Sequence, residues 1–210
     1  MATIQLGDEA PNFQADTTAG PIDFHAYLGD GWGILFSHPA DFTPVCTTEL
    51  GAVAKLVPEF AKRNTKVVAV SVDPLESHRR WLGDIADVTG ARPAYPLVAD
   101  PDRAVATGYG MIHPNASTTA TVRSLFVIGP DKKVKLTLTY PASTGRDFGE
   151  ILRALDSLQL TAAYQVATPA DWRPGGDVII TAAVSDADAA VRFPGFTTVK
   201  PYLRTTAQPR

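Results

Sequence analysis

The single cysteine of this chain lies where a reactive thiol is expected. Cys46 follows Thr43 and Pro44, which are residue types that typically cap and begin a helix. The cysteine therefore falls in the first turn of a predicted helix. Unpaired backbone N–H groups and the positive end of the helix dipole favour an anion there, and this raises the thiolate fraction. The position makes a nucleophilic thiol as plausible as a buried, inert cysteine, and the local sequence leaves both open.

Other cysteine chemistries fit this sequence poorly. A disulfide oxidoreductase often carries a second thiol in Cys-x-x-Cys, and the fourth position here is Glu49. One cysteine and four scattered histidines offer no metal-ligand spacing, so we predict neither a metal nor a cofactor. The remaining chemistry is nucleophilic attack by one thiolate, with any later step requiring a thiol from another molecule.

Composition narrows the class of protein. The chain has 210 residues, with 19 Lys+Arg against 22 Asp+Glu, and its net charge is −3. This length allows one full domain and a small second one, and the absence of a basic block argues against nucleic-acid binding. One cysteine rules out a disulfide-stapled secreted scaffold. The sequence has no signal-peptide pattern and no apolar run of about 18 residues, so we expect a cytoplasmic protein with no membrane association.

The elements that must position Cys46 alternate along the chain. Short apolar runs typical of buried strands cover residues 32–36, 66–72, 95–99 and 123–128. After the first run, a helical face is formed by Val53, Leu56, Val57 and Phe60. After the second, Asp73 as N-cap and Pro74 at the first helical position predict a helix through about Val88. This alternation predicts βαβ units with parallel strands in an α/β domain.

The sheet is expected to be mixed. Residues 123–128 and 134–140 flank a Gly-Pro-Asp turn, so we predict that they pair as an antiparallel hairpin. The spacing of apolar residues from Phe148 to Leu158 then predicts an amphipathic helix.

The chain changes character from about Thr161. Its prolines and glycines leave room for one short strand near 178–181 and one short helix from Ser185. We therefore expect this tail to lack a core of its own and to bury its aromatic side chains on the main domain or, preferably, on another subunit. The predicted organisation is a domain over 1–162 and a C-terminal segment over 163–210.

The sequence around Cys46 resembles the peroxiredoxins. The run Pro39-Ala-Asp-Phe-Thr-Pro-Val-Cys46 fits the signature Pro-x-x-x-Thr-x-x-Cys, and Thr-Thr-Glu-Leu continues it. Three later segments, which begin at Arg123, Tyr140 and Leu155, and the closing Tyr-Leu-Arg also resemble the one-cysteine, peroxiredoxin 6 class. The resemblance covers nearly the whole chain. It implies a thioredoxin-like α/β fold, a mixed sheet flanked by helices, with a small C-terminal dimerisation segment.

The resemblance also implies a function and a site. The expected function is a thiol-dependent peroxidase that reduces hydrogen peroxide and organic hydroperoxides through a sulfenic acid on Cys46. In this class Thr43 would hold the peroxide, Pro39 would shield the thiolate, and Arg123 would pair with sulfur and peroxide. A guanidinium suits that role because it stays charged and can bridge two acceptors. Without the resemblance, the sequence favours a solvated charge for Arg123 at the start of a strand.

Three further residues have supporting roles in the resembled class. Glu49, one helical turn after Cys46, would orient the arginine, although by itself it could be a surface carboxylate. Arg146 would supply a second guanidinium near the site, or could be an ordinary charge at a helix start. His38 would lie close to the sulfur, whereas a lone histidine beside a strand end is more often a structural hydrogen-bonding group.

Two departures limit the expected chemistry. Mammalian members are also described as phospholipases using a serine in Gly-Asp-Ser-Trp-Gly, and Gly31 stands at the serine position here, so we predict no such activity even though His25 and Asp131 match the other proposed members. The chain also lacks a resolving cysteine, so an external thiol or a thiol protein must reduce the sulfenic acid.

Two other interpretations of the sequence remain beside a homodimeric peroxidase. One is a redox-sensing or holdase-type binding protein that is switched by oxidation of Cys46. The other is an acyl-transfer enzyme that uses Cys46 and His38. Sustained consumption of peroxide in the presence of a thiol distinguishes the peroxidase from both.

Overall fold

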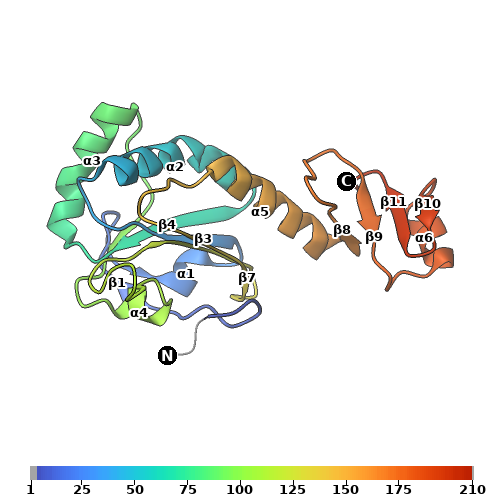
Figure 1. The fold of residues 1–210 in the computed structure, drawn as a ribbon, viewed down its shortest axis with the longest axis horizontal. Helices are drawn as coiled ribbons and strands as arrows, with labels where there is room; N and C mark the ends of the chain where they lie inside the picture. The colour runs from blue at the N-terminus through green and yellow to red at the C-terminus, as the bar shows by residue number, and fades with distance from the viewer. Residues whose placement is uncertain (1–3, 210) are drawn as a thin grey trace. The chain divides into compact units, whose positions relative to one another are not determined.

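The computed structural model describes residues 4–209 and divides the chain into two compact units. The first extends to Phe148 and the second begins at Gly149. Figure 1 shows their elements in chain order. The expected boundary between 162 and 163, which marks the start of the proposed dimerisation segment, stays a prediction.

A five-stranded mixed sheet forms the centre of the first unit. Its order is β5 (Leu97–Ala99), β4 (Thr65–Ser71), β3 (Trp32–Ser37), β6 (Arg123–Ile128) and β7 (Val134–Tyr140). β3, β4 and β5 are parallel, whereas β6 runs antiparallel to both β3 and β7. The predicted βαβ units and the predicted hairpin are therefore confirmed.

Helices cover both faces of this sheet (Figure 1). α2 (Pro44–Lys62) and α3 (Leu75–Thr89) lie on one side, and α1 (Phe24–Leu28) and α4 (Ala104–Gly108) lie on the other. The short helices α1 and α4, and a two-stranded sheet of β1 (Gln14–Ala15) and β2 (Ile22–Asp23), have no counterpart in the sequence-based expectation.

The start of α3 differs from the expectation in one respect. Its N-cap is Pro74 rather than Asp73. The carboxylate of Asp73 instead accepts hydrogen bonds from the backbone N–H of Asp41 at 3.0 Å and from the Ser71 hydroxyl at 2.8 Å. Asp73 therefore ties the end of β4 to the connection that leads into α2.

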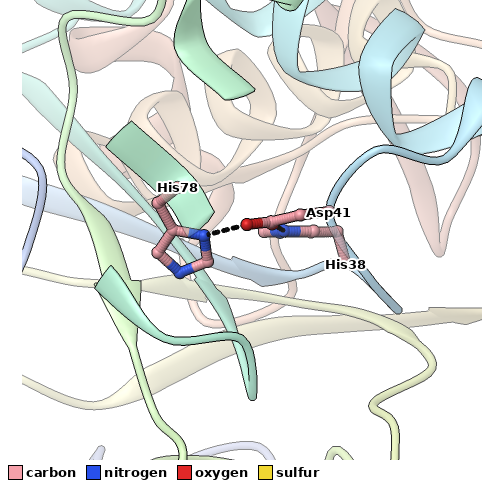
Figure 2. Close-up of side chains that lie close together, drawn as sticks. All are labelled: His38, Asp41 and His78. Carbon is pink, nitrogen blue, oxygen red and sulfur yellow. Dashed lines mark hydrogen bonds and ion pairs between the residues drawn. The ribbon is translucent and has the colours of Figure 1, made fainter. Parts of the chain in front are cut away.

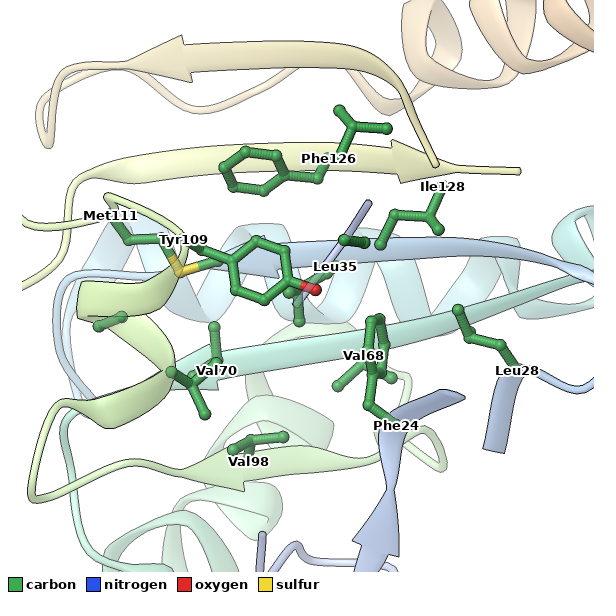
Figure 3. Close-up of a cluster of buried hydrophobic side chains, with 14 residues drawn as sticks. Phe24, Leu28, Leu35, Val68, Val70, Val98, Tyr109, Met111, Phe126 and Ile128 are labelled. Atoms are coloured by element: carbon green, nitrogen blue, oxygen red, sulfur yellow. The ribbon is translucent and has the colours of Figure 1, made fainter. Parts of the chain in front are cut away.

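One core packs between the sheet and the α1 and α4 side (Figure 3). Leu35, Val68 and Val98 contribute from three neighbouring strands, while Phe24 and Tyr109 cover them. Tyr109 uses its hydroxyl to donate to the backbone oxygen of Pro11 at 2.7 Å, so the ring is buried without leaving its polar atom unpaired. This packing fixes the strands whose ends carry the candidate site.

The second unit builds a core of its own, so the expectation that the tail could not do so was wrong. After α5 (Phe148–Ala163), a four-stranded antiparallel sheet has the order β10 (Thr197–Lys200), β11 (Leu203–Thr206), β9 (Val178–Ile180) and β8 (Val166–Ala167). α6 (Asp186–Arg192) begins after Ser185, as predicted. The core comprises Leu160, Val166, Trp172, Val178, Ile180, Val184, Ala189 and Phe193.

Aromatic side chains of the second unit divide between this core and the surface. Trp172 and Phe193 are buried in the core, and Phe196 packs partly against it. Tyr202 remains 85% exposed. The aromatic content of the tail is therefore largely explained within the unit. Over residues 4–209, none of the helices combines the length and the apolar character that a membrane crossing requires.

Candidate active site around Cys46

Cys46 lies in the first turn of α2 and is fully buried. Thr43 is the N-cap with an extended backbone, and Pro44 is the first helical residue, as predicted. The Thr43 side chain does not cap the helix, because its hydroxyl donates to the backbone oxygen of Ala40 at 2.8 Å. The thiol therefore lies beside the N-terminal N–H groups of a 19-residue helix, where an anion is favoured.

Arg123 reaches the thiol from the sheet. It is the first residue of β6, and its Nη1 lies 3.4 Å from the Cys46 Sγ. Nε and Nη2 of the same guanidinium donate to the backbone oxygen of Ala142 at 3.0 and 2.6 Å. Arg123 is only 2% exposed, so the alternative of a solvated surface charge is wrong.

Glu49 holds both predicted arginines. Its carboxylate accepts from Arg123 Nη1 at 2.7 Å, and from the backbone N–H, Nε and Nη2 of Arg146 at 2.8 Å each. Burial by itself would raise the pKa of Glu49, but hydrogen bonds and charge from Arg146 and the charge of Arg123 bring that pKa below its usual range. Glu49 is therefore the anion that orients Arg123 toward the thiol.

Arg146 completes this cluster from the segment before α5. Its Nη1 donates to the backbone oxygen of Ser124 at 2.9 Å. Its Cζ lies 4.9 Å from the centre of the Phe36 ring and 5.7 Å from that of Phe148. Two aromatic faces and one carboxylate thus hold a guanidinium that is 7% exposed.

Pro39 and Thr43 lie on the connection between β3 and α2, and both are partly exposed. Phe42, which immediately precedes Thr43, has a φ of 53°, a left-handed conformation that is unfavourable for a residue with a large side chain. The position of Thr43 therefore depends on the strained backbone of Phe42, and the surrounding structure must stabilise that conformation.

His38 is fully buried and hydrogen-bonded to Asp41. Its Nε2 lies 3.0 Å from Asp41 Oδ1, and its Nδ1 has no hydrogen-bond partner within residues 4–209. Asp41 also contacts His78 of α3. The histidines were expected to be scattered, but His38 and His78 lie close together, with ring centres 5.9 Å apart. No local signal could have found it, because Asp41 and His78 are 37 positions apart.

The His38, Asp41 and His78 side chains form the one group among the described residues whose types could hold a metal. Nδ1 of His78 faces Asp41 Oδ2 at 2.7 Å and Nε2 faces the backbone oxygen of Val98 at 3.1 Å. Both nitrogens of that ring are thus engaged by acceptors of the protein. We therefore interpret the group as a hydrogen-bond network.

The residues that align with the proposed phospholipase members have other partners in this chain. His25 Nε2 lies 2.8 Å from the backbone oxygen of Ala10, and Asp131 pairs with Lys135 at 2.6 Å. At Gly31, a Cβ would lie 2.7 Å from the backbone oxygen of Asn64. A side chain at position 31 therefore requires a shift of the neighbouring backbone.

The arrangement around Cys46 fits thiolate attack on a small electrophile. A fixed guanidinium beside the sulfur can stabilise both the thiolate and the negative charge on a departing oxygen. Because the guanidinium is already bound by Glu49 and Ala142, it needs little reorganisation during the reaction.

Comparison with known proteins agrees with this chemistry. Residues 6–137 match the AhpC/TSA family, and residues 157–195 match the C-terminal domain of 1-Cys peroxiredoxin. The 1-Cys peroxiredoxin of Dictyostelium discoideum is 55% identical over 207 residues, which cover 98% of this chain and 86% of the relative. Peroxiredoxin-6 of Gallus gallus is 52% identical over all of both chains.

Solved structures share the fold as well. A cysteine-to-serine mutant of the peroxiredoxin 6 of Arenicola marina superimposes with a TM-score of 0.94 at 48% identity, covering 99% of each chain. The yeast mitochondrial 1-Cys peroxiredoxin gives a TM-score of 0.93 at 48% identity, covering 98% of this chain and 100% of the other. A buried thiol held by an arginine, these full-length similarities and the thioredoxin-like fold show that this chain belongs to the peroxiredoxins, as a one-cysteine thiol-dependent peroxidase.

Proposed function

We propose that Cys46 is the thiol that peroxide oxidises and that Arg123 is the group that stabilises the reacting atoms. The observation that carries this proposal is the 3.4 Å contact between Arg123 Nη1 and Cys46 Sγ, together with the anchoring of the same guanidinium by Glu49. The substrates are hydrogen peroxide and organic hydroperoxides.

The proposed reaction begins with the thiolate of Cys46 attacking one peroxide oxygen. A sulfur–oxygen bond forms and the oxygen–oxygen bond breaks, so sulfur is oxidised to a sulfenic acid and the peroxide is reduced. The departing oxygen leaves with the bonding electron pair and takes a proton to become water or an alcohol. Arg123 lies where it can donate to that oxygen. Thr43, the N-cap of the helix that carries Cys46, would bind the peroxide through its hydroxyl, which donates to the backbone oxygen of Ala40 in the free protein.

Regeneration requires two thiols from outside the chain, because Cys46 is the single cysteine. One thiol attacks the sulfenic sulfur, forms a mixed disulfide and releases water. A second thiol then displaces the Cys46 thiolate and leaves with the first as a disulfide. The solved yeast relative concerns thiol resolution through glutathione and thioredoxin systems, which supports a reductant of that class here. A reducing compartment such as the cytoplasm would supply it.

The partner in assembly is proposed to be a second copy of this chain. The match of residues 157–195 to the C-terminal domain of 1-Cys peroxiredoxin supports this role for the second unit. Because that unit has its own core, it could present a preformed surface to the partner. Measurement of the mass in solution tests the homodimer.

The oxidation step is tested without any added thiol. Reduced protein is mixed with one equivalent of hydrogen peroxide, trapped with a sulfenic-acid reagent and read by mass spectrometry. We expect the adduct on Cys46 to form much faster than on free cysteine, and Cys46→Ser to give none. A rate equal to that of free cysteine would refute the peroxidase function. An unchanged rate in Arg123→Ala would refute the assignment of Arg123.

A further inference from the structure

A buried network of charged and polar side chains includes two residues, His38 and Asp41, of the connection between β3 and α2. Figure 2 shows Asp41 between the two imidazoles. Asp41 Oδ1 lies 3.0 Å from His38 Nε2, and Oδ2 lies 2.7 Å from His78 Nδ1. Both histidines are fully buried and Asp41 is 7% exposed. The proposed peroxidase chemistry uses none of these side chains, so the cluster requires an explanation of its own.

The hydrogen bonds of His78 fix its protonation. Its Nε2 faces the backbone oxygen of Val98 at 3.1 Å, and a carbonyl oxygen can only accept, so Nε2 carries a proton. Its Nδ1 faces a carboxylate oxygen of Asp41. Burial would raise the pKa of Asp41, but hydrogen bonds from His38 and His78 and the charge of His78 bring it well below the usual range. The carboxylate is therefore ionised, and Nδ1 of His78 must also carry a proton.

The same carboxylate fixes the tautomer of His38. The Nε2 of His38 donates to Asp41 Oδ1. Complete burial lowers the pKa of His38; hydrogen bonding and charge from Asp41 oppose that shift, and the positive His78, whose ring centre lies 5.9 Å away, reinforces it. His38 is therefore a neutral imidazole with its proton on Nε2. Its Nδ1 is left as a buried acceptor without a partner among the described residues.

Neighbouring residues also contact Asp41 and His38. Asp73 accepts from the backbone N–H of Asp41 at 3.0 Å, and the Thr121 hydroxyl donates to the backbone oxygen of His38 at 2.8 Å. The Trp81 ring covers His38 with ring centres 5.3 Å apart. The charged groups at the cluster are thus Asp41, Asp73 and His78. Directly after Asp41 comes Phe42, whose left-handed backbone depends on firm anchoring on both sides.

We propose that the buried Asp41–His78 ion pair is a positioning device for the peroxidase site: it locks the neutral tautomer of His38 and holds the strained connection that places Thr43 ahead of Cys46. Asp41 and His78 are positioning residues, because they act through the connection and no contact of theirs reaches the sulfur. The effect on turnover rests on the proposed peroxidase function, whereas the protonation pattern does not.

The protonation pattern is tested on the unaltered protein. Nitrogen-15 NMR of the labelled, reduced chain at pH 8 distinguishes an imidazolium from each neutral tautomer, and His78→Gln and His38→Gln assign the signals. We expect both nitrogens of His78 to be protonated, because each of them faces an acceptor of the protein. We expect His38 to carry its proton on Nε2. A neutral His78, or a His38 protonated on Nδ1, would overturn the proposal.

The positioning role is tested with Asp41→Asn, which keeps the shape and removes the charge. We expect the rate constant for oxidation of Cys46 by hydrogen peroxide to fall about tenfold or more, since small misplacements of reacting groups have large kinetic effects. We also expect the pH dependence of this rate constant to change, because burial then lowers the pKa of His38 without the opposing hydrogen bond and charge of Asp41. The matched control is Asp84→Asn, which removes an exposed carboxylate from α3 and should change neither.

A double variant separates positioning from simple loss of folding. Asp41→Asn with His78→Gln should be more stable than the two single changes predict in sum, because the single change leaves a buried imidazolium without its partner. It should still oxidise slowly. If a folded Asp41→Asn protein keeps the wild-type rate and pH profile, the positioning role is refuted. If the unaltered protein is not oxidised by peroxide at all, the proposed function fails instead, and the NMR result still decides the protonation pattern.

Discussion

Replacing Glu49 by Gln tests the electrostatic argument for the site most directly. The change keeps the size of the side chain but removes the one carboxylate that binds both Arg123 and Arg146. Those guanidiniums are 2% and 7% exposed, so water cannot take over the role of the carboxylate. Two buried cations would then face each other across an amide that has one acceptor oxygen in place of two.

The expected loss of stability follows from the number and type of bonds removed. Glu49 accepts four hydrogen bonds, three of them from charged guanidinium nitrogens and one from a backbone N–H. Removing one partner of a buried ion pair costs about 3–5 kcal/mol, because the remaining charge is left uncompensated. We therefore expect the free energy of unfolding of Glu49→Gln at pH 7 to fall by about that amount.

The effect should also depend on pH. The pKa of Glu49 is lowered in the folded state, so its stabilising contribution is fully present above the unfolded pKa of about 4.3 and is lost as the pH falls through the folded value. The difference between wild type and variant should therefore shrink in acid. Urea unfolding between pH 3 and pH 8 measures both quantities.

An exposed glutamate on the same helix provides the control. Glu59, whose side chain is 40% exposed, pairs with Lys62 and Arg63, and such surface pairs contribute little to stability. Glu59→Gln should thus be close to wild type. A Glu49→Gln protein that loses less than about 1 kcal/mol, and keeps the acid dependence of the wild type, would show that the arginines do not depend on this carboxylate.

Three further outcomes are expected. Arg123→Lys should slow oxidation of Cys46 by about a hundredfold or more in stopped-flow measurements, because an ammonium lacks the planar fork that binds Glu49 and Ala142 together; a change below threefold contradicts this. Thr43→Val should slow the same step while Thr43→Ser keeps it, and equal rates for both would remove the hydroxyl from the mechanism. Trp172→Ala should destabilise the second unit by about 3–5 kcal/mol, seen as earlier exchange of its amides with no change in those of the central sheet.

Local sequence patterns predicted the central sheet well because its strands are apolar runs with clear ends. The hairpin of β6 and β7 occupies the predicted residues, and β3 and β4 differ by a single residue at their ends. The strands of the second unit were mostly missed, since they are only two to four residues long and carry no recognisable alternation. The core of the second unit forms where segments distant in the sequence pair, so a short stretch of sequence does not reveal it.

Some residues of the site could likewise be predicted from local sequence, and others could not. The position of Cys46 at a helix start is local and could be read from Thr43 and Pro44. Arg123 lies 77 positions from Cys46, so composition and spacing left it as a surface charge and the family resemblance alone placed it. The expectation that His38 lies near the sulfur stays a prediction, and its hydrogen bond to Asp41 was not foreseen. Asp41 and His78 were not singled out at all, because only the packing of α3 against the connection brings them together.

Glu49 has one negative charge to share between two guanidiniums, and this shapes what happens after oxidation. When Cys46 is a thiolate, the net charge of the buried group is zero, because the two anions, Cys46 and Glu49, balance the two guanidiniums. A neutral sulfenic acid leaves the same buried group with an excess of one positive charge. We therefore expect oxidation to weaken the interactions that hold the first turn of α2, when a reductant larger than peroxide must reach a fully buried sulfur. Faster amide exchange in that turn after one equivalent of peroxide would show that the site opens because the sulfenic acid leaves a net positive charge in it.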